Sequence, residues 1–240
     1  MERHSPQEPN PSLERTHYQL RATGVKHESK NALRSGIHTR GYLPHVKREG
    51  AAYFVTFRLA DSLPKEVLLR FERERAERLR RLNDFARRGE SCNDSAEDVA
   101  RDFRRRVERF LDHGAGACHL RRPEIAKLVA GAMRHFHESR YLLREWVVMP
   151  NHVHAIIWPM ANYLLGDILK SWKQFTSRRA KALLALGEEP FWQPESYDHW
   201  IRDDDERGRI SRYIRNNPVT AKLCSRAEDW CWSSAWPAQS

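Results

Sequence analysis

The segment that decides the fold is Tyr141-Leu-Leu-Arg-Glu-Trp-Val-Val-Met-Pro-Asn-His-Val-His-Ala-Ile-Ile-Trp158. Two runs of β-branched and aromatic residues flank the turn-forming pair Pro150-Asn151, a pattern typical of an antiparallel hairpin. Alternate residues of a strand point to the same face of a sheet, so His152 and His154 share a face and can bind one metal ion. Two ordinary surface or half-buried histidines would show the same spacing.

A second His-x-His sequence, His135-Phe136-His137, does not indicate a metal site. It falls in residues 123–137, whose apolar periodicity predicts a helix. Helix positions two residues apart point about 200° apart around the axis, so these two imidazoles cannot share a ligand. Only His152 and His154 form a candidate chelate.

The segments before this hairpin predict a strand and a long helical stretch. Residues 53–59 are an aromatic and β-branched run of strand length. Residues 64–110 are rich in charge, with a partial helical stripe and a break near residues 89–94. That pattern predicts a solvated helical hairpin with i,i+4 ion pairs.

The segments after the hairpin predict two more helices. Residues 164–186 have helical character, and Asp203 is a suitable N-cap for a last helix that Pro218 is expected to end. In that last helix Tyr213 and Asn217 lie four residues apart and therefore on one face. A core tyrosine and a helix-terminating asparagine would give the same pattern, but beside two strand histidines they indicate a metal site with a nucleophile.

The charge of the chain favours a polyanionic partner such as nucleic acid. Its 240 residues include 42 Lys and Arg against 32 Asp and Glu, a net charge of +10, and the pI is near 9.7. The excess gathers between Ile168 and Gly187, which contains five basic residues and no acid. The candidate phosphate contacts are Lys170, Lys173, Arg178 and Arg179, and the candidates for stacking on bases are Trp172 and Trp192. A merely solvated basic helix and core tryptophans remain the alternative.

The composition also excludes several classes of protein. A hydrophobic content of 40% excludes disorder throughout. The four cysteines form no CxxC pair and no zinc-finger spacing, so neither a disulfide scaffold nor a structural zinc site is indicated. No signal-peptide core and no run of 18 apolar residues occurs, which predicts a soluble cytoplasmic protein without a membrane partner. Residues 1–40 have almost no apolar pattern and are expected to form a flexible extension.

Several motifs in sequence order resemble the single-tyrosine HUH transposases, and most closely the REP-associated tyrosine transposases. They are Trp146-Val-Val-Met-Pro-Asn-His-Val-His154, Trp172-Lys-Gln-Phe-Thr176, Phe191-Trp-Gln193, Tyr197-Asp198, Ile201-Arg202, Tyr213-Ile-Arg-Asn-Asn-Pro-Val219 and Trp232-Ser-Ser234. The resemblance implies an α+β fold: a ferredoxin-like (RRM-like) antiparallel sheet with helices packed on it. Residues 41–240 would form this single domain, with a helical insertion at about residues 65–137.

The resemblance also implies an activity. It is metal-dependent cleavage and rejoining of single-stranded DNA near hairpin (REP-like) sequences, through a 5′-phosphotyrosine intermediate. By position, His152 and His154 match the two HUH histidines, Asn217 the third metal ligand, and Tyr213 the nucleophile. The expected cofactor is Mg²⁺ or Mn²⁺, and the expected partner is single-stranded DNA with a hairpin. Such a protein would be nucleoid-associated and a monomer or homodimer.

Two other functions remain open from the residues. One is a non-catalytic or domesticated ferredoxin-like nucleic-acid-binding protein that keeps the histidines as structure. The other is a His-x-His metallohydrolase of small phosphoesters, which is weakened because no Asp closely follows His154 to complete a hydrolytic cluster.

Overall fold

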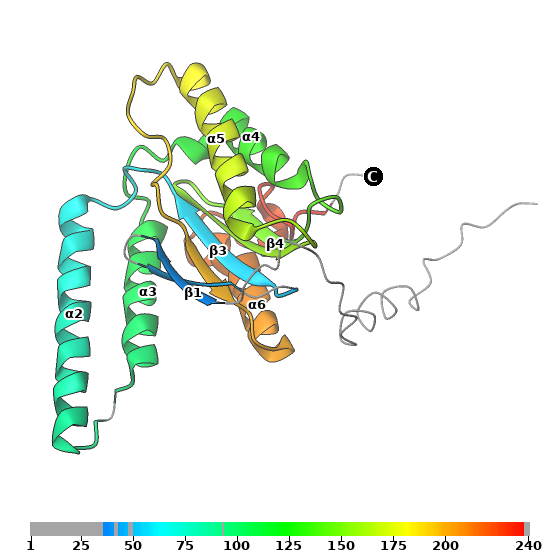
Figure 1. Cartoon of the computed structure of the whole chain (residues 1–240). Helices are drawn as coiled ribbons and strands as arrows, with labels where there is room; N and C mark the ends of the chain where they lie inside the picture. The colour runs from blue at the N-terminus through cyan, green and yellow to red at the C-terminus, as the bar shows by residue number, and fades with distance from the viewer. Residues whose placement is uncertain (1–35, 41–42, 48–49, 93, 238–240) are drawn as a thin grey trace, which may run out of the picture.

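A computed structural model describes residues 36–40, 43–47, 50–92 and 94–237. Its centre is a four-stranded sheet in the order β4-β5-β3-β6, in which every neighbouring pair is antiparallel (Figure 1). The strands are β3 (Tyr53–Arg58), β4 (Tyr141–Val148), β5 (His152–Pro159) and β6 (Tyr197–Trp200). A separate two-stranded sheet pairs β1 (Gly36–Arg40) with β2 (Leu43–Lys47).

The helices alternate with the strands in the order expected of a ferredoxin-like fold. They are α2 (Lys65–Arg88), α3 (Ala96–Asp112), α4 (Pro123–Arg134), α5 (Leu165–Leu184) and α6 (Asp204–Thr220), with short 3₁₀ turns η1 (His119–Arg121) and η2 (Ala227–Asp229). The sequence β3-α4-β4-β5-α5-β6, with β3 and β5 central, is the ferredoxin-like connection. The predicted α+β class is confirmed.

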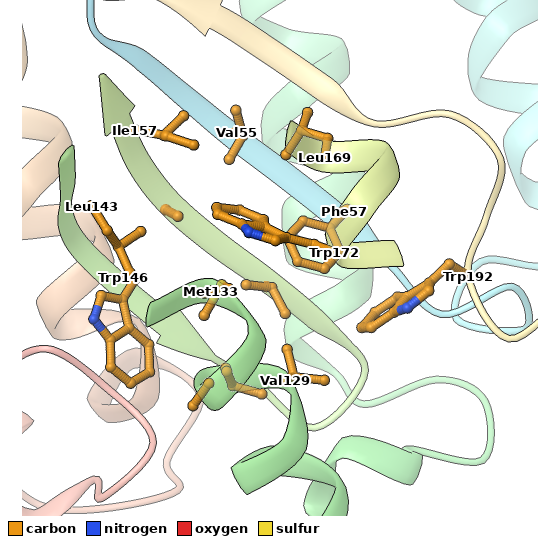
Figure 2. Close-up of a cluster of buried hydrophobic side chains, with 14 of the residues drawn as sticks. Val55, Phe57, Val129, Met133, Leu143, Trp146, Ile157, Leu169, Trp172 and Trp192 are labelled. Atoms are coloured by element: carbon orange, nitrogen blue, oxygen red, sulfur yellow. The ribbon is translucent and has the colours of Figure 1, made fainter. Parts of the chain in front are cut away.

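One face of the sheet packs against α4 and α5. Odd-numbered residues of β3 and β5, such as Val55, Phe57 and Ile157, meet Val129 and Met133 of α4 and the side chains of α5 in one buried cluster (Figure 2). All of these residues are apolar because alternate strand positions on this face meet only helix. This is the larger of the two cores.

The opposite face packs against α6. Even-numbered residues Phe54 and Ile156 join Val147, Ile201 and Ile214 in a second buried cluster. Both faces of the sheet are therefore covered, which explains why its central strands read as nearly continuous apolar runs. The two faces carry different chemistry, because His152 and His154 lie on the face that meets α6.

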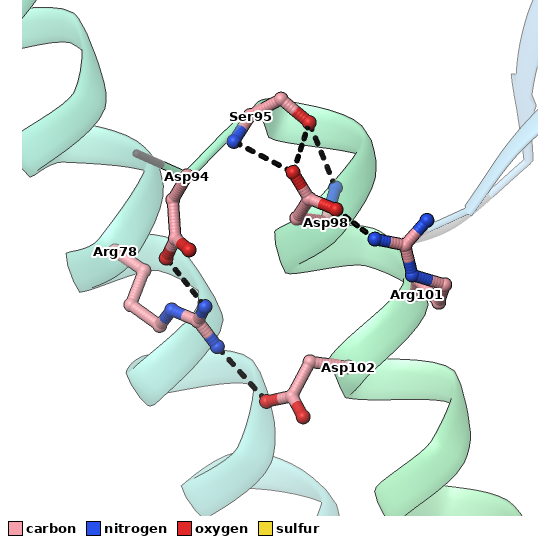
Figure 3. Close-up of polar contacts among 6 residues, drawn as sticks. All are labelled: Arg78, Asp94, Ser95, Asp98, Arg101 and Asp102. Atoms are coloured by element: carbon pink, nitrogen blue, oxygen red, sulfur yellow. Dashed lines mark hydrogen bonds and ion pairs between the residues drawn. The ribbon is translucent and has the colours of Figure 1, made fainter. Parts of the chain in front are cut away.

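Helices α2 and α3 form an arm that extends away from the sheet (Figure 1). Gly89 ends α2 in a left-handed conformation with φ of 69°, which suits glycine. Ser95 caps α3 through a capping box with Asp98, and Arg78 of α2 bridges Asp94 and Asp102 at 2.6 and 2.9 Å (Figure 3). The arm is a solvated helical hairpin, as the sequence predicted, but the ion pairs found in its described residues connect α2 with α3 and the linker before it, or lie at i,i+3, and not at the predicted i,i+4 spacing.

The inserted segment is shorter than the sequence indicated. Helix α4 packs on α5 and the sheet as an element of the ferredoxin-like fold, so the insertion ends before Pro123 rather than near residue 137. Helix α4 itself ends at Arg134, and beyond it the Nδ1 atom of His137 accepts a hydrogen bond of 3.0 Å from the Leu143 N–H. His137 is thus a structural residue of the loop that precedes β4.

Two further boundaries differ from the prediction. The flexible extension expected over residues 1–40 lies outside the described residues except for Gly36–Arg40, which forms β1. Pro218 does not end the last helix, because α6 continues through it to Thr220. Proline costs the helix one hydrogen bond here, and the Ala221 N–H still reaches the Asn217 carbonyl at 2.9 Å.

Trp172 and Trp192 are core residues, so the prediction that they stack on DNA bases is wrong. They are only 3% and 5% exposed. The Trp172 indole N–H donates to the Tyr141 hydroxyl at 2.8 Å, and that of Trp192 donates to Thr176 Oγ1 at 2.8 Å. Neither ring has a free face for a base.

In the described part of the chain, no helix has the length and apolar character needed to cross a membrane.

Replacing Trp172 by Ala should therefore affect stability. Removal of a buried indole and its hydrogen bond is expected to cost about 3–5 kcal/mol, or roughly 6 to 20 °C in Tm. Thermal unfolding followed by circular dichroism measures this. Trp236→Ala is the control, since Trp236 is 37% exposed and should change Tm by little. A Trp172→Ala protein with the wild-type Tm would contradict the packing described above.

Candidate active site

The structure brings four of the predicted site residues together beneath α6. His152 and His154 project from β5, with ring centroids 4.7 Å apart. Tyr213 and Asn217 come from the facing side of α6, and the Tyr213 hydroxyl lies 3.2 Å from His154 Nε2. Both histidines are 0% exposed and Asn217 is 1% exposed. The alternation of β5 and the four-residue spacing on α6 place these groups on facing surfaces.

The Asn151 side chain fixes which nitrogen of His152 carries a hydrogen. Its Nδ2 donates to the carbonyl oxygens of Leu111 (3.1 Å) and Ala115 (2.9 Å), so its Oδ1 is the atom 2.7 Å from His152 Nδ1. An amide oxygen only accepts hydrogen bonds; His152 Nδ1 is therefore the donor, and Nε2 keeps its lone pair. Sequence reasoning treated Asn151 only as a turn residue and missed this role.

His154 is held by contacts at both ring nitrogens. Thr56 Oγ1 lies 2.8 Å from Nδ1, across the β3–β5 ladder. Burial lowers the pKa of His152 to about 3, and burial together with its neighbour His152 lowers the pKa of His154 well below its usual value. Both imidazoles are therefore neutral, which is the form that binds metal ions.

Several buried polar atoms at this site have no hydrogen-bond partner among the described residues. They are His152 Nε2, Asp112 Oδ1, and both the Oδ1 and Nδ2 atoms of Asn217. Leaving one such group unsatisfied in a protein interior costs about 1–3 kcal/mol. Three of the four atoms are electron-pair donors, and this is the donor set that a cation would satisfy.

The inserted helix α3 also reaches this site. Its C-terminal residue Asp112 lies with Oδ1 3.8 Å from His152 Nε2, and Glu108, one turn earlier, lies beside Tyr213. Burial raises the pKa of Asp112 to about 6 and that of Glu108 to about 7. No sequence pattern indicated either residue, because they are two acids among many in a charged helix far from the His-Val-His motif.

Tyr213 is half-buried beside two acidic side chains. Burial raises the pKa of its hydroxyl, and the nearby carboxylates of Glu108 and Asp112 raise it further. The ring packs edge-on against Phe54, with centroids 6.1 Å apart. The hydroxyl therefore stays protonated at rest, and deprotonation needs a base beside it.

Within the described ranges, no group of three or more His, Cys, Asp or Glu side chains is arranged to hold an ion. The set of metal ligands predicted from the sequence is different, because its third member is the amide of Asn217. The buried, unpaired atoms of His152 and Asn217 are the observation with which a divalent ion fits.

The predicted DNA contacts lie on the other side of the sheet from this site. Helix α5 packs on the face opposite α6, and Lys170, Arg178 and Arg179 are exposed on its outer side. Lys173 instead holds a loop, since its Nζ donates to the Pro194 carbonyl at 2.8 Å and to Ser196 Oγ at 3.2 Å. Burial, with the nearby charge of Arg58, lowers the pKa of Lys173 to about 8.

The exposed aromatic residue of α5 is Phe175, which the sequence reasoning did not single out. It is 40% exposed, and the Arg179 guanidinium lies 6.0 Å from its ring centroid. Phe175 is thus the aromatic ring of this helix that has an open face, where Trp172 has none.

Comparison with known proteins gives one family and one curated relative. Residues 122–217 match the family model described as "Transposase IS200 like". Over 96 residues the chain is 31% identical to the REP-associated tyrosine transposase of Escherichia coli (strain K12), an alignment that covers 38% of this chain and 53% of that protein. The chain therefore spans about half the length of this relative. The resemblance read from the sequence is confirmed for the segment from α4 to Asn217.

A solved structure of a REP-associated tyrosine transposase bound to a REP hairpin is also similar. It aligns over 82% of this chain and 81% of that chain, at 16% identity and a TM-score of 0.44. The matched family segment contains His152, His154, Tyr213 and Asn217. It excludes α2 and α3, and therefore Glu108 and Asp112.

Asn151→Ala should destabilise both the orientation of the His152 ring and the packing of the end of α3 against β5. Two backbone carbonyls and His152 Nδ1 would lose their partners, which is expected to cost about 2–4 kcal/mol of stability. Hydrogen exchange of residues 108–116 should accelerate along with the fall in Tm, because Asn151 ties this end of α3 to β5. The control is Asn216→Ala, which alters an exposed amide and should change stability by less than about 0.5 kcal/mol. Unchanged exchange at residues 108–116 would show that Asn151 does not anchor α3.

Proposed function

We propose that this protein, whose residues 122–217 match the IS200-like transposases, is a metal-dependent DNA transposase. It cleaves and rejoins single-stranded DNA near a hairpin, with Tyr213 as the nucleophile and a 5′-phosphotyrosine as the intermediate. The observation that carries the proposal is the meeting of unpaired, buried metal-donor atoms with a tyrosine hydroxyl 3.2 Å from one of the two histidines. A binding-only protein would gain nothing from burying such groups at a cost in stability.

The ion that fits the proposed site is Mg²⁺ or Mn²⁺. His152 Nε2, His154 Nε2 and Asn217 Oδ1 would hold it, and their neutral imidazoles and amide oxygen suit a divalent ion that keeps positions open for a phosphate. When bound, the ion polarises the scissile phosphate as a Lewis acid. Asn151 and Thr56 support this role by fixing the orientation of the two imidazoles.

Tyr213 performs the covalent step. Its Oη attacks the scissile phosphorus, the new Oη–P bond replaces the P–O bond to the 3′ oxygen, and that oxygen leaves to become a free 3′-OH. The hydroxyl proton must be accepted as the attack proceeds. Glu108 lies beside Tyr213, and with a pKa raised to about 7 it is ionised for much of the time at neutral pH, so it suits this role.

The phosphotyrosine conserves the energy of the broken bond. A 3′-OH from another strand can therefore attack the phosphorus, release Tyr213 and rejoin the DNA. The Tyr213 hydroxyl lies 3.2 Å from His154 Nε2 of the same chain, so the proposed step needs no residue from a second protomer. A DNA substrate would place this reaction in the cytoplasm, at the nucleoid.

The outer side of α5 is the proposed surface for the DNA hairpin. Lys170, Arg178 and Arg179 supply positive charge there, and Phe175 supplies an exposed ring. Phosphate contacts position a nucleic acid, and a ring can stack on an unpaired base. The sheet separates this surface from Tyr213, so hairpin binding and strand cleavage are expected to be separable by mutation.

Tyr213→Phe should abolish the covalent adduct while it preserves hairpin binding. The assay incubates the protein with a single-stranded oligonucleotide carrying a hairpin and Mn²⁺, and resolves the protein–DNA adduct on a denaturing gel. Tyr163→Phe is the matched control, since Tyr163 is 39% exposed and its ring lies beside Arg140, outside the proposed site. EDTA should abolish the adduct of the wild type. An adduct formed by Tyr213→Phe would contradict the assignment, and no EDTA-sensitive cleavage on any hairpin substrate would favour a binding-only protein.

Charge reversal on α5 should weaken hairpin binding without changing the chemistry. The double variant Lys170→Glu, Arg178→Glu should bind a hairpin oligonucleotide at least about tenfold less tightly, with a shallower dependence on salt concentration. Its rate of adduct formation on a short unstructured oligonucleotide at saturating concentration should equal that of the wild type. Arg87→Glu with Arg88→Glu, two exposed residues at the end of α2, is the control. Equal loss of affinity in both double variants would mean that α5 is not a specific surface.

A further inference from the structure

Asp112 is the last residue of α3, at the point where the inserted arm meets the sheet. We propose that Asp112 supplies a carboxylate ligand to the divalent ion, in addition to His152, His154 and Asn217. This inference rests on the proposed function. It makes the insertion, which lies before the segment that matches the family model, a part of the metal site.

The position of the Asp112 carboxylate is the first argument. Its Oδ1 is buried without a hydrogen-bond partner in the described residues, and the neighbouring metal donor, His152 Nε2, lacks one as well. The two atoms lie 3.8 Å apart, which is too far for a hydrogen bond. Two ligands that each lie about 2.0–2.1 Å from one Mg²⁺ are separated by at most about 4.2 Å. In octahedral geometry, adjacent ligand atoms are about 2.9 Å apart and opposite ones about 4.2 Å apart. The observed separation lies between these values, so a small rotation of the carboxylate brings both atoms within reach of one ion.

The charge of the site is the second argument. His152, His154 and Asn217 contribute three neutral donors and no negative charge. Mg²⁺ and Mn²⁺ are hard cations that prefer carboxylate oxygen among the protein ligands. Glu108 is engaged with Tyr213 and Arg104, whereas Asp112 forms no ion pair with a Lys or Arg in the described residues. Asp112 is thus the free carboxylate beside the donor set.

The anchoring of α3 is the third argument. Asn151 hydrogen-bonds the carbonyl of Leu111, the residue before Asp112, and the same side chain orients the imidazole of His152. One amide therefore fixes two of the proposed ligands relative to each other, as expected of a residue that supports a metal site. On the other side of the loop, the Ala117 N–H donates to Asp61 Oδ2 at 2.6 Å and holds the chain after α3 against the end of β3.

The small movement that ion binding needs is available to Asp112. As they stand, the His and Asp side chains do not enclose an ion by themselves. The Asp112 side chain is 17% exposed, against 1% for His152, so it has room to rotate toward the histidines. The backbone that carries it is fixed, and only the carboxylate has to move.

The test measures Mn²⁺ binding directly on the full-length protein, by the electron paramagnetic resonance signal of the free ion. Asp112→Asn should bind Mn²⁺ at least about tenfold more weakly than the wild type. Asp102→Asn is the matched control: it alters an acid on the same helix whose surface ion pair with Arg78 points away from the site. It should bind Mn²⁺ like the wild type. His152→Ala should lose high-affinity binding altogether.

A second measurement separates metal binding from folding. Without added metal, Asp112→Asn should unfold at or above the wild-type Tm, because it removes an unpaired buried carboxylate. Millimolar Mn²⁺ should raise the Tm of the wild type and of Asp102→Asn more than that of Asp112→Asn. Should Asp112→Asn unfold at lower temperature without metal, Asp112→Ser repeats the comparison with a smaller side chain.

The outcomes distinguish this inference from the proposed function. Wild-type Mn²⁺ affinity in Asp112→Asn, with loss of binding in His152→Ala, overturns the role of Asp112 and leaves the histidine site intact. Equal Mn²⁺ binding by wild type and His152→Ala overturns both. Weakened binding in Asp112→Asn and not in Asp102→Asn supports both.

Discussion

The constraint on which the rest of the structure depends is the burial of unpaired electron-pair donors on one face of the sheet. His152 Nε2, Asn217 Oδ1 and Asp112 Oδ1 all lie in the interior without hydrogen-bond partners in the described part of the chain. Each such group costs about 1–3 kcal/mol, a large amount for a protein whose total stability is about 5–15 kcal/mol. The surrounding fold must supply that energy, and the large apolar core beneath α4 and α5 is the part that can do so.

The two faces of the sheet have different roles, one in the core and one in the proposed site. The face beneath α4 and α5 is apolar and holds the buried tryptophans, while the face beneath α6 carries the histidines, Tyr213 and Asn217. Because strand residues alternate, a single strand such as β5 contributes Val153 and Ile157 to the first face and His152 and His154 to the second. In the arm formed by α2 and α3, the C-terminal end of α3 lies beside this polar face. The ion-paired outer half of the arm is ordinary solvated helix, but its inner end brings Glu108 and Asp112 to the site.

Much of this arrangement could be predicted from the sequence, and the reasons for the failures are specific. The β4–β5 hairpin, the shared face of His152 and His154 and the spacing of Tyr213 and Asn217 follow from local periodicity. The burial of Trp172, the loop-holding role of Lys173 and the position of α5 opposite the histidines depend on which face each helix covers, and spacing along the chain does not specify that. Glu108 and Asp112 lie about 40 residues before the motif in a helix rich in acids, so only tertiary packing identifies them.

The central claim is that α3 and α6 close over β5 to form one metal site with a nucleophile beside it. A crystal structure of the protein grown with Mn²⁺, with anomalous scattering data, tests it most directly. The account predicts an anomalous peak within about 2.3 Å of His152 Nε2, His154 Nε2, Asn217 Oδ1 and an Asp112 carboxylate oxygen. A fully ordered site with no peak among these four residues, or a peak elsewhere on the protein, would contradict it.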